Sequence, residues 1–397
     1  MYDAARLART SLVGLAALLL PSVGWALALP ELIAGLPEVS AARAALEEAE
    51  AHRAAVRAWE PLALDARLLP GVALEGELGL TAGVDLRGAR QQRAQSAEEA
   101  VASARAHLRR VEAEAGAALG EQLLDLGYCR ARVSLLEEVV RWGDESASLA
   151  RRRAEAGVED AVEVSLVLAG ASADAGALYR AQLEVEEAEA ALRSRLQRAA
   201  GGSVPDVPLT CPLSPPPLGD TLARVGGAPA VVEAEATLRS AQAAARAARR
   251  EVGPDLRVGP SLGLVGGEAR WGAAVGLGLP FAGGERAEAR AAAARVAGAE
   301  AALEAATREV EITVQTSLLR WEGARSRREA LLPLQGELAL AEERALSRYR
   351  AGQGDLYALL QVHQARLALE TEVLDRCREQ RRAVLHLEGA LGAPLSP

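Results

Sequence analysis

The sequence predicts a mainly α-helical protein with a small β part, built from long coiled-coil helices and two β-hairpins. Three observations predict this fold. Apolar residues recur at seven-residue steps along very long Ala, Glu and Arg-rich runs, two shorter segments alternate with period two, and this layout occurs twice within 397 residues. Seven-residue spacing is typical of a left-handed coiled coil. Period two is typical of β-strands.

The first 28 residues have the layout of a cleaved secretory signal peptide. Arg6 and Arg9 precede an apolar stretch from Leu12 to Leu20, and Ala26-Leu27-Ala28 supplies the small residues of a cleavage site. This stretch is too short to cross a bilayer, which needs about 20 residues, and no other window comes near that length. We therefore expect export without a transmembrane helix, and no lipid anchor because the residue directly after the cleavage site is not a cysteine.

Composition excludes several classes of protein. The formal net charge is -9, the wrong sign for a protein that binds nucleic acid. We find no nucleotide-binding loop, serine-hydrolase elbow or zinc-protease motif, so we expect neither an enzyme nor a cofactor. The four histidines show no i, i+4 pairing and no adjacent cysteine, so no metal site is predicted.

The three cysteines, Cys129, Cys211 and Cys377, are an odd number and lie far apart in a long chain. We therefore expect none of them to form a structural disulfide.

The chain divides into two halves with the same order of segments. After the signal peptide, the predicted segments are an N-terminal helix (29–60), β-hairpin 1 (61–88), helical hairpin 1 (89–200), a Pro-rich connector (201–220), a helix (221–253), β-hairpin 2 (254–284), helical hairpin 2 (285–392) and a short tail (393–397). Each helical hairpin has a glycine break, Gly157 or Gly352, after a run long enough for a helix of about 100 Å. Such helices need lateral partners along their whole length.

The seven-residue steps are clearest in three series: Leu119, Leu126, Val133 and Val140; Val296, Leu303 and Val310; and Leu360, Leu367 and Leu374. These series alone are equally compatible with an ordinary coiled-coil rod. The alternating segments decide between such a rod and a fold that combines long helices with β-hairpins.

In hairpin 1 the even positions from Val72 to Leu86 are apolar or small, whereas the odd positions are mostly glycine and acidic residues. The even series extends back to Leu62, so the turn must hold an odd number of residues. A turn at Glu75-Gly76-Glu77 and a turn at Pro70-Gly71 both remain open.

In hairpin 2 the apolar parity switches between Leu264 and Ala269, which predicts a four-residue loop at 265–268. The arms have about ten residues, the length of a tilted membrane-spanning strand.

Two hairpins cannot close a barrel, and open sheet edges are not tolerated in lipid. Four strands per chain can close only by pooling with other chains, and three chains would give a twelve-stranded membrane barrel. Trp59, Trp271 and Phe281 lie at hairpin ends, where interface aromatics are found. The alternative is a small soluble β-sandwich, but the opposite strand face, mostly Gly, Ala and acidic residues, is more typical of a lumen.

At this point the sequence resembles the TolC family of outer-membrane factors over nearly the whole mature chain. The stretch LGLPFAGGERAEARAAAARVAGAEAAL at 277–303 is similar to the family's entry from strand into long helix, and RYRAGQGDLYALLQVHQARLALE at 348–370 is similar to its Arg-Tyr-x-x-Gly turn and return helix. The ending LEGALG at 387–392 and a degenerate first turn at 151–164 also resemble the family.

The resemblance implies a homotrimer with a β-barrel in the outer membrane, an α-helical barrel across the periplasm and an equatorial belt near the connector. It implies a passive duct for a tripartite efflux pump or type I secretion, working with a periplasmic adaptor (membrane fusion) protein and an inner-membrane pump, in contact with outer-membrane lipid. Here the hairpins are short, so the extracellular loops should be minimal.

The helical turns are the candidate functional site. Gly157 and Gly352 are followed three residues later by Asp160 and Asp355. Locally, each pair reads as a glycine C-cap and an aspartate N-cap, with Glu163 completing a capping box in the first copy. The family resemblance adds a functional interpretation, in which both turns line the periplasmic entrance and contact the adaptor.

Further charges near these turns are candidate aperture residues: Glu159, Glu163, Arg153, Arg348 and Arg350. Ordinary solvated arginine is the simpler interpretation of the three basic residues.

A competing function is a periplasmic adaptor or scaffolding coiled coil with soluble β-hairpins. An adaptor would normally have one helical hairpin inserted in a larger β domain, whereas this chain repeats both kinds of hairpin.

Overall fold

The computed structural model describes residues 32–57, 63–69, 75–84, 88–157, 160–196, 208–211, 218–252, 255–265, 268–278 and 284–393. The predicted signal peptide, Trp59, Phe281, Glu159 and most of the predicted connector lie outside these ranges. The chain forms two compact units: unit 1 comprises 1–40, 112–224 and 311–397, and unit 2 comprises 41–111 and 225–310.

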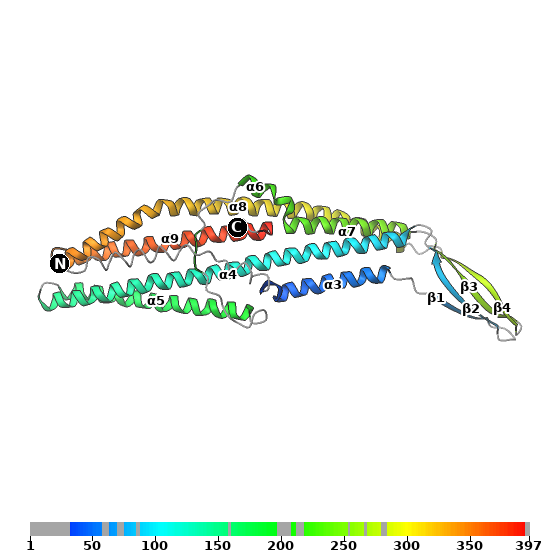
Figure 1. Ribbon diagram of the computed structural model, residues 1–397, viewed down its shortest axis with the longest axis horizontal. Coiled ribbons are helices and arrows are strands. Elements are labelled where there is room, and N and C mark those ends of the chain that lie inside the picture. Colours follow the sequence, from blue (N-terminus) through cyan, green and yellow to red (C-terminus); the bar gives the residue numbers. More distant parts are fainter. Residues whose placement is uncertain are drawn as a thin grey trace. The chain divides into compact units, whose positions relative to one another are not determined.

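Eleven of the described elements position the candidate sites (Figure 1). In chain order they are α3 (Pro37–Arg57), β1 (Ala63–Leu69), β2 (Glu75–Val84), α4 (Ala89–Glu155), α5 (Ala161–Leu196), α6 (Leu218–Ala223), α7 (Pro229–Glu251), β3 (Asp255–Val265), β4 (Glu268–Gly278), α8 (Gly284–Arg350) and α9 (Leu356–Leu391). The helices and the two hairpins thus agree with the predicted mainly α fold.

The helix expected at 221–253 is interrupted. Helix α6 ends at Ala223, a 3₁₀ turn covers Val225–Gly227, and α7 begins at Pro229. Proline suits the first turn of a helix, where its missing N–H has no partner to lose, and the two glycines before it weaken any continuous helix.

Unit 1 holds α5, α9 and the C-terminal parts of α4 and α8 (Figure 1). One apolar cluster joins α4 to α5 and contains Leu119, Leu123, Leu126, Leu192 and Leu196. A second joins α8 to α9 through Trp321, Ala383 and Val384. Leu119 and Leu126 of the predicted seven-residue series are therefore core residues.

The series predicted in α9 does not form the core of the single chain. Leu360, Leu367 and Leu374 are only half-buried, and the buried positions near them are Leu359 and His363. The single chain therefore buries one side of this series of leucines and leaves the other side partly exposed.

Unit 2 contains the β-sheet, whose strands lie in the order β1-β2-β3-β4 and are all antiparallel to their neighbours. In hairpin 1, Leu69 pairs with Glu75, so the turn falls within 70–74, an odd number of residues. A turn at Glu75-Gly76-Glu77 is therefore wrong, because all three residues pair with β1.

In hairpin 2, Val265 pairs with Glu268, so the loop is the two residues between them and the predicted four-residue loop is too long. The parity switch that motivated the prediction is real, because Leu264 lies opposite Ala269 and Leu262 opposite Trp271.

The register sorts the sheet into two chemically different faces. Alternation along the paired strands assigns the ionisable strand residues to one face: Asp65, Arg67, Glu75, Glu77, Asp255, Arg257, Glu268 and Arg270. The other face carries Leu, Val, Ala, Pro and Trp271 with a single glycine, Gly76. On that apolar face, Trp271 is 80% exposed and Val275 is 68% exposed.

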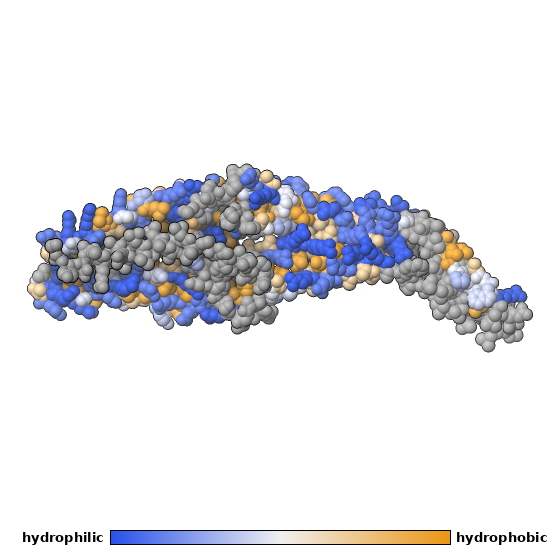
Figure 2. Space-filling model, in the orientation of Figure 1, coloured by the Kyte–Doolittle hydropathy of each residue, from blue (hydrophilic) through white to orange (hydrophobic). Residues whose placement is uncertain are grey.

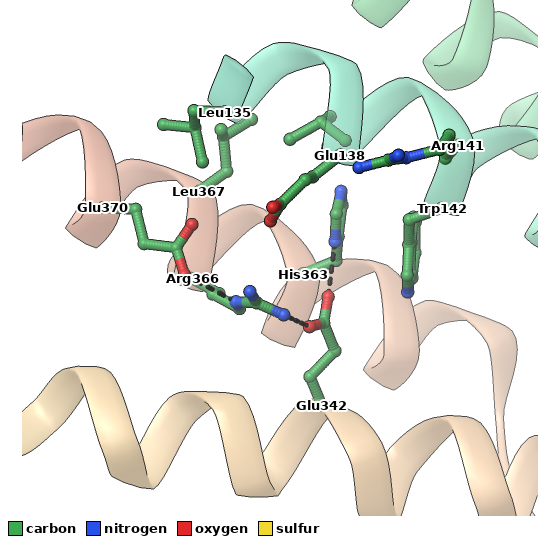
Figure 3. Close-up of a pocket in the computed structure, with 10 residues that line it drawn as sticks. Leu135, Glu138, Arg141, Trp142, Glu342, His363, Arg366, Leu367 and Glu370 are labelled. Carbon is green, nitrogen blue, oxygen red and sulfur yellow. Dashed lines mark hydrogen bonds and ion pairs between the residues drawn. The ribbon is translucent and has the colours of Figure 1, made fainter. Parts of the chain in front are cut away.

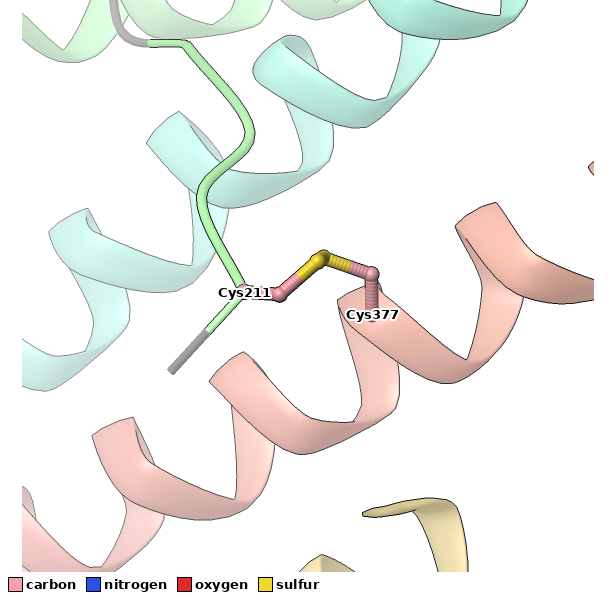
Figure 4. Close-up of a disulfide and its surroundings, with 2 residues drawn as sticks. All are labelled: Cys211 and Cys377. Atoms are coloured by element: carbon pink, nitrogen blue, oxygen red, sulfur yellow. A yellow bond between two sulfur atoms is a disulfide. The ribbon is translucent and has the colours of Figure 1, made fainter. Parts of the chain in front are cut away.

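The expectation that no cysteine forms a structural disulfide is wrong. Cys211, in the segment between the two halves, is bonded to Cys377 of α9 in unit 1 (Figure 4). Cys129 is a free thiol, and burial raises its pKa, as do the nearby carboxylates of Glu184 and Asp125.

Helix α5 also departs from expectation, because by length and composition it is apolar enough to cross a membrane. Only 6% of its most apolar window is buried, and Val162, Leu166 and Tyr179 are each more than half exposed. Figure 2 shows the general pattern on one face: hydrophilic residues predominate over the described helices, with apolar residues between them.

Candidate functional site

The second helical turn is built around Gly352. Its φ is 75°, its N–H donates to the carbonyl of Tyr349 (3.1 Å), and the N–H of Gln353 donates to the carbonyl of Arg348 (2.9 Å). These two bonds form a Schellman cap, which satisfies the last carbonyls of α8 and requires a left-handed residue. At Gly354, an added Cβ would lie 2.8 Å from the backbone nitrogen of Tyr349, so the turn also needs glycine there.

Asp355 begins the return helix. Its backbone is extended, and its carboxylate accepts a hydrogen bond from the N–H of Tyr357 at 3.2 Å. This bond satisfies a free donor at the start of α9.

The first turn repeats this design in simpler form. Gly157 has a φ of 73° and its N–H donates to the carbonyl of Ala154 at 2.9 Å. Asp160 precedes α5 and accepts, through its backbone carbonyl, from Val164 (3.2 Å). Asp160 is exposed and Glu163 is half-buried.

Two contacts tie the end of α4 to the end of α8. Arg153 donates from Nη1 to the carbonyl oxygen of Tyr349 at 2.6 Å and stacks over the Tyr349 ring, 4.5 Å from its centroid. Arg350 pairs in the other direction, with Glu145 of α4. Arg153 and Arg350 therefore act between helices, whereas Arg348 is exposed.

An apolar core lies directly behind the two turns. It joins α4, α5, α8 and α9 through the buried residues Ala147, Ala150, Val167, Tyr349, Leu356 and Leu359. Tyr349 is fully buried, so the link from Arg153 ends on a residue of this core. The turns are consequently supported by packing from four helices.

A polar cluster adjoins this core in unit 1 (Figure 3). Glu342 reaches from α8 toward His363 and Arg366 of α9: His363 Nδ1 donates to Glu342 at 2.5 Å, and Arg366 binds the second carboxylate oxygen. Arg366 also donates to Glu370 at 2.7 Å. The ring of His363 stacks on Trp142 of α4, with centroids 3.5 Å apart.

The cluster lines a cavity of about 240 Å³, to which α4 also contributes Glu138 and Arg141. Burial alone would raise the pKa of Glu342, but the hydrogen bonds from His363 and Arg366 outweigh it and lower that pKa. Burial raises the pKa of Asp174 on α5, an effect that the charge of His363 opposes. Glu342 is thus held as a carboxylate between two donors.

The sequence analysis did not single out Glu342, Arg366 or Trp142 and treated His363 as an ordinary helix residue. A signal was present, because His363 follows Leu356 and Leu359 at the three- and four-residue steps of a buried stripe. Within the described residues, no group of His, Cys, Asp and Glu side chains is placed to hold a metal ion.

Part of the chain is similar to a known protein family. Residues 225–393 match the family described as outer membrane efflux protein. No curated protein sequence matches the chain.

Among solved structures, the outer-membrane channel OprN superposes with a TM-score of 0.76 at 21% identity, covering 93% of this chain and 90% of that one. The outer membrane protein VceC of Vibrio cholerae gives 0.76 at 18% identity, covering 93% and 96%. The open MtrE channel of Neisseria gonorrhoeae gives 0.73 at 20% identity, covering 93% and 89%. Residues 225–393 thus resemble the outer membrane efflux protein family, and over nearly its whole length the chain has the fold of these outer-membrane channels.

Proposed function

We propose that the chain is one subunit of a trimeric outer-membrane duct, a passive exit for solutes driven by a separate pump. The two-faced sheet carries this proposal. Trp271 and Val275 are exposed on its apolar face, and register assigns all the ionisable strand residues to the opposite face. A soluble sheet would bury the apolar face, whereas a membrane barrel turns it to lipid and its polar face to water.

The edges of the sheet support pooling of chains. Strands β1 and β4 each pair on one side within the described chain, and unpaired edges are not tolerated in hydrocarbon. Two copies would supply eight strands, a barrel whose interior side chains fill. Three copies would supply twelve, which leaves room for a lumen.

The helices support the same assembly. Val162 and Leu166 of α5 and Leu319 of α8 are each more than half exposed in the single chain. Neighbouring subunits that packed against these side chains would close an α-helical barrel, and burying a large apolar side chain contributes about 1.5–3 kcal/mol.

The partners and the turn residues belong to the same proposal. A periplasmic adaptor would contact the turns at Gly157, Asp160, Gly352 and Asp355, and an inner-membrane pump would drive efflux or type I secretion. Arg153, Arg348, Arg350, Glu159 and Glu163 would set the charge of the entrance. Trp59, Trp271 and Phe281 would lie at the membrane interfaces.

The oligomeric state of the mature chain tests this proposal first. Extraction from outer membranes in mild detergent should give a trimer that needs detergent and dissociates on heating before electrophoresis. A soluble monomer or dimer from the periplasm would overturn it and favour the scaffolding alternative.

Single-channel conductance tests the entrance. Asp160→Asn with Asp355→Asn removes two charges per subunit while keeping an oxygen acceptor for the Asp355 cap. The cation preference of the channel should fall, and an unchanged preference would remove both aspartates from the proposed aperture. The matched control is Glu288→Gln with Glu300→Gln, which removes two exposed charges at the opposite end of α8 from the turn.

A further inference from the structure

The strand register brings four helix ends to one edge of the sheet. Val84 pairs with Leu256, Asp255 pairs with Gly278, and Ala63 pairs with Thr81, so all four helix-facing strand ends lie together. Connectors of three to five residues then lead to the ends of α3, α4, α7 and α8. These helix ends lie in unit 2 with the sheet, and Figure 1 shows α3, α4 and α7 ending beside it.

This edge is strongly basic in a chain whose net charge is -9. The last six residues of α3 and α7 and the first six of α4 and α8 contain eight arginines and three glutamates. We call the eight arginines the arginine band: Arg53, Arg57, Arg90, Arg93, Arg246, Arg249, Arg250 and Arg286. In sequence, the four connectors contain one further arginine, Arg87, and two acidic residues, Glu60 and Asp85, so the net charge of these segments stays positive.

Helix stability explains five of the eight arginines in the arginine band but not the other three. Arginines at the C-terminal ends of α3 and α7 favour the helix dipole. Arg90 and Arg93 lie at the N-terminal end of α4, where positive charge opposes the dipole, and no acidic residue is present in that first turn. Arg286 stands in the same unfavourable position on α8.

Several members of the arginine band are exposed to an outside partner. These include Arg246, Arg249 and Arg286. Arg57 pairs with Glu98 yet remains 56% exposed at its side chain. Arg90 donates to the last-turn carbonyl of Arg57 at 3.5 Å, a contact that holds the ends of α3 and α4 together.

We infer that the arginine band binds the phosphate groups of anionic phospholipid headgroups. This inference rests on the proposed membrane sheet, because the arginine band lies at the edge where the apolar face that carries Val258 and Val275 ends. Where that face leaves the hydrocarbon at the helix-facing edge, the next groups that the protein meets are headgroups. Arginine is suited to phosphate because its planar guanidinium donates two parallel hydrogen bonds.

Lipid selectivity of the inserted trimer tests the inference. Purified trimers are reconstituted in phosphatidylcholine vesicles that contain trace spin-labelled phosphatidylglycerol or spin-labelled phosphatidylcholine, and electron paramagnetic resonance measures the immobilised fraction of each label. The wild-type protein should prefer phosphatidylglycerol about fivefold, the effect of roughly one basic residue at a membrane surface. High salt should weaken the preference.

Three variants assign the preference to the arginine band. Arg246→Gln with Arg249→Gln and Arg286→Gln should bring it close to equality. The same three positions changed to Lys should keep it, because the charge remains. The matched control, Arg151→Gln with Arg320→Gln and Arg344→Gln, removes three exposed arginines of unit 1 and should leave it unchanged.

Each outcome separates the inference from the proposed function. Failure of the wild-type chain to insert as a trimer would overturn the membrane duct itself. Insertion with equal binding of the two lipids would overturn only the headgroup inference, as would a preference that survives the three Gln substitutions. Loss of the trimer in the Gln variant without a changed preference in the remaining trimers would assign the arginine band to subunit contacts.

Discussion

Removal of the Cys211–Cys377 disulfide should destabilise unit 1 by a few kcal/mol. The bond joins residues 166 positions apart. In the chain-entropy treatment, closing a loop of that size stabilises the folded state by about 5 kcal/mol, and losses measured on removing native disulfides are about 2–5 kcal/mol. The bond fastens the segment between the two halves to α9, so its loss removes a link between parts of the chain that are far apart in sequence.

Three variants measure this effect: Cys211→Ala, Cys377→Ala and the double substitution. Each single change already breaks the bond, so the double variant should be at least as stable as the less stable of the two single variants. The urea concentration at which far-ultraviolet circular dichroism is lost should fall similarly in all three. Cys129→Ala is the control, because Cys129 is the free thiol.

Thiol counting provides the decisive result. In denaturant without reductant, the mature chain should label at one cysteine, and at three after reduction. Labelling of three thiols before reduction would refute the bond. Additive losses in the two single variants would show that each cysteine contributes only by its own packing.

Three further predictions concern unit 1. Glu342→Gln should lower stability by about 3 kcal/mol, because it removes the carboxylate between His363 and Arg366. Because the pKa of Glu342 is lowered, its carboxylate stabilises the fold fully above about pH 4.5, and this stabilisation is lost as the pH falls further. Urea titrations should therefore show a smaller fall in unfolding free energy at acid pH in the variant than in the wild type. Burial and the hydrogen bond to Asp375 raise the pKa of Tyr128 from 10.0 to about 12. The protonated Tyr128 therefore stabilises the fold fully below pH 10, and this stabilisation is lost as the pH rises through 12. Tyr128→Phe should reduce the fall in unfolding free energy over this range, and an unchanged fall would contradict the assignment. Gly352→Ala should lower the free energy of unfolding by about 1–2 kcal/mol, because the φ of Gly352 is 75°. Gly354→Ala should lower it more, because the new Cβ would lie 2.8 Å from a backbone nitrogen. Urea midpoints equal to that of the wild type in both variants would contradict the turn geometry.

Periodicity predicted the fold well because the helices and strands are long and regular. The strand parity in hairpin 2 survived in the structure even though the loop was two residues shorter than expected, since parity depends only on which residues lie opposite each other. In hairpin 1, Gly76 suggested a turn, but pairing of Glu75 and Glu77 with β1 decided otherwise. Local turn preference is weaker than a complete ladder of hydrogen bonds.

The candidate site was only partly predictable. Gly157 and Gly352 were found because a helix that ends in the left-handed region strongly favours glycine. The pairing of Cys211 with Cys377 and the cluster around Glu342 depend on segments that meet only in the folded chain. Sequence distance carries no information about such contacts, so spacing arguments missed them.

The lengths of the helices restrict how such a protein can change. Helices α4 and α8 each have 67 residues, and α5 and α9 each have 36. One residue inserted in a single helix would turn everything beyond it by about 100° and move its apolar stripe off its neighbours. A longer helical part therefore requires whole heptads added to all four helices together. The loops between strands can lengthen one residue at a time. Evolution along this fold should vary the loops freely and change the reach only in coordinated steps of about 10 Å.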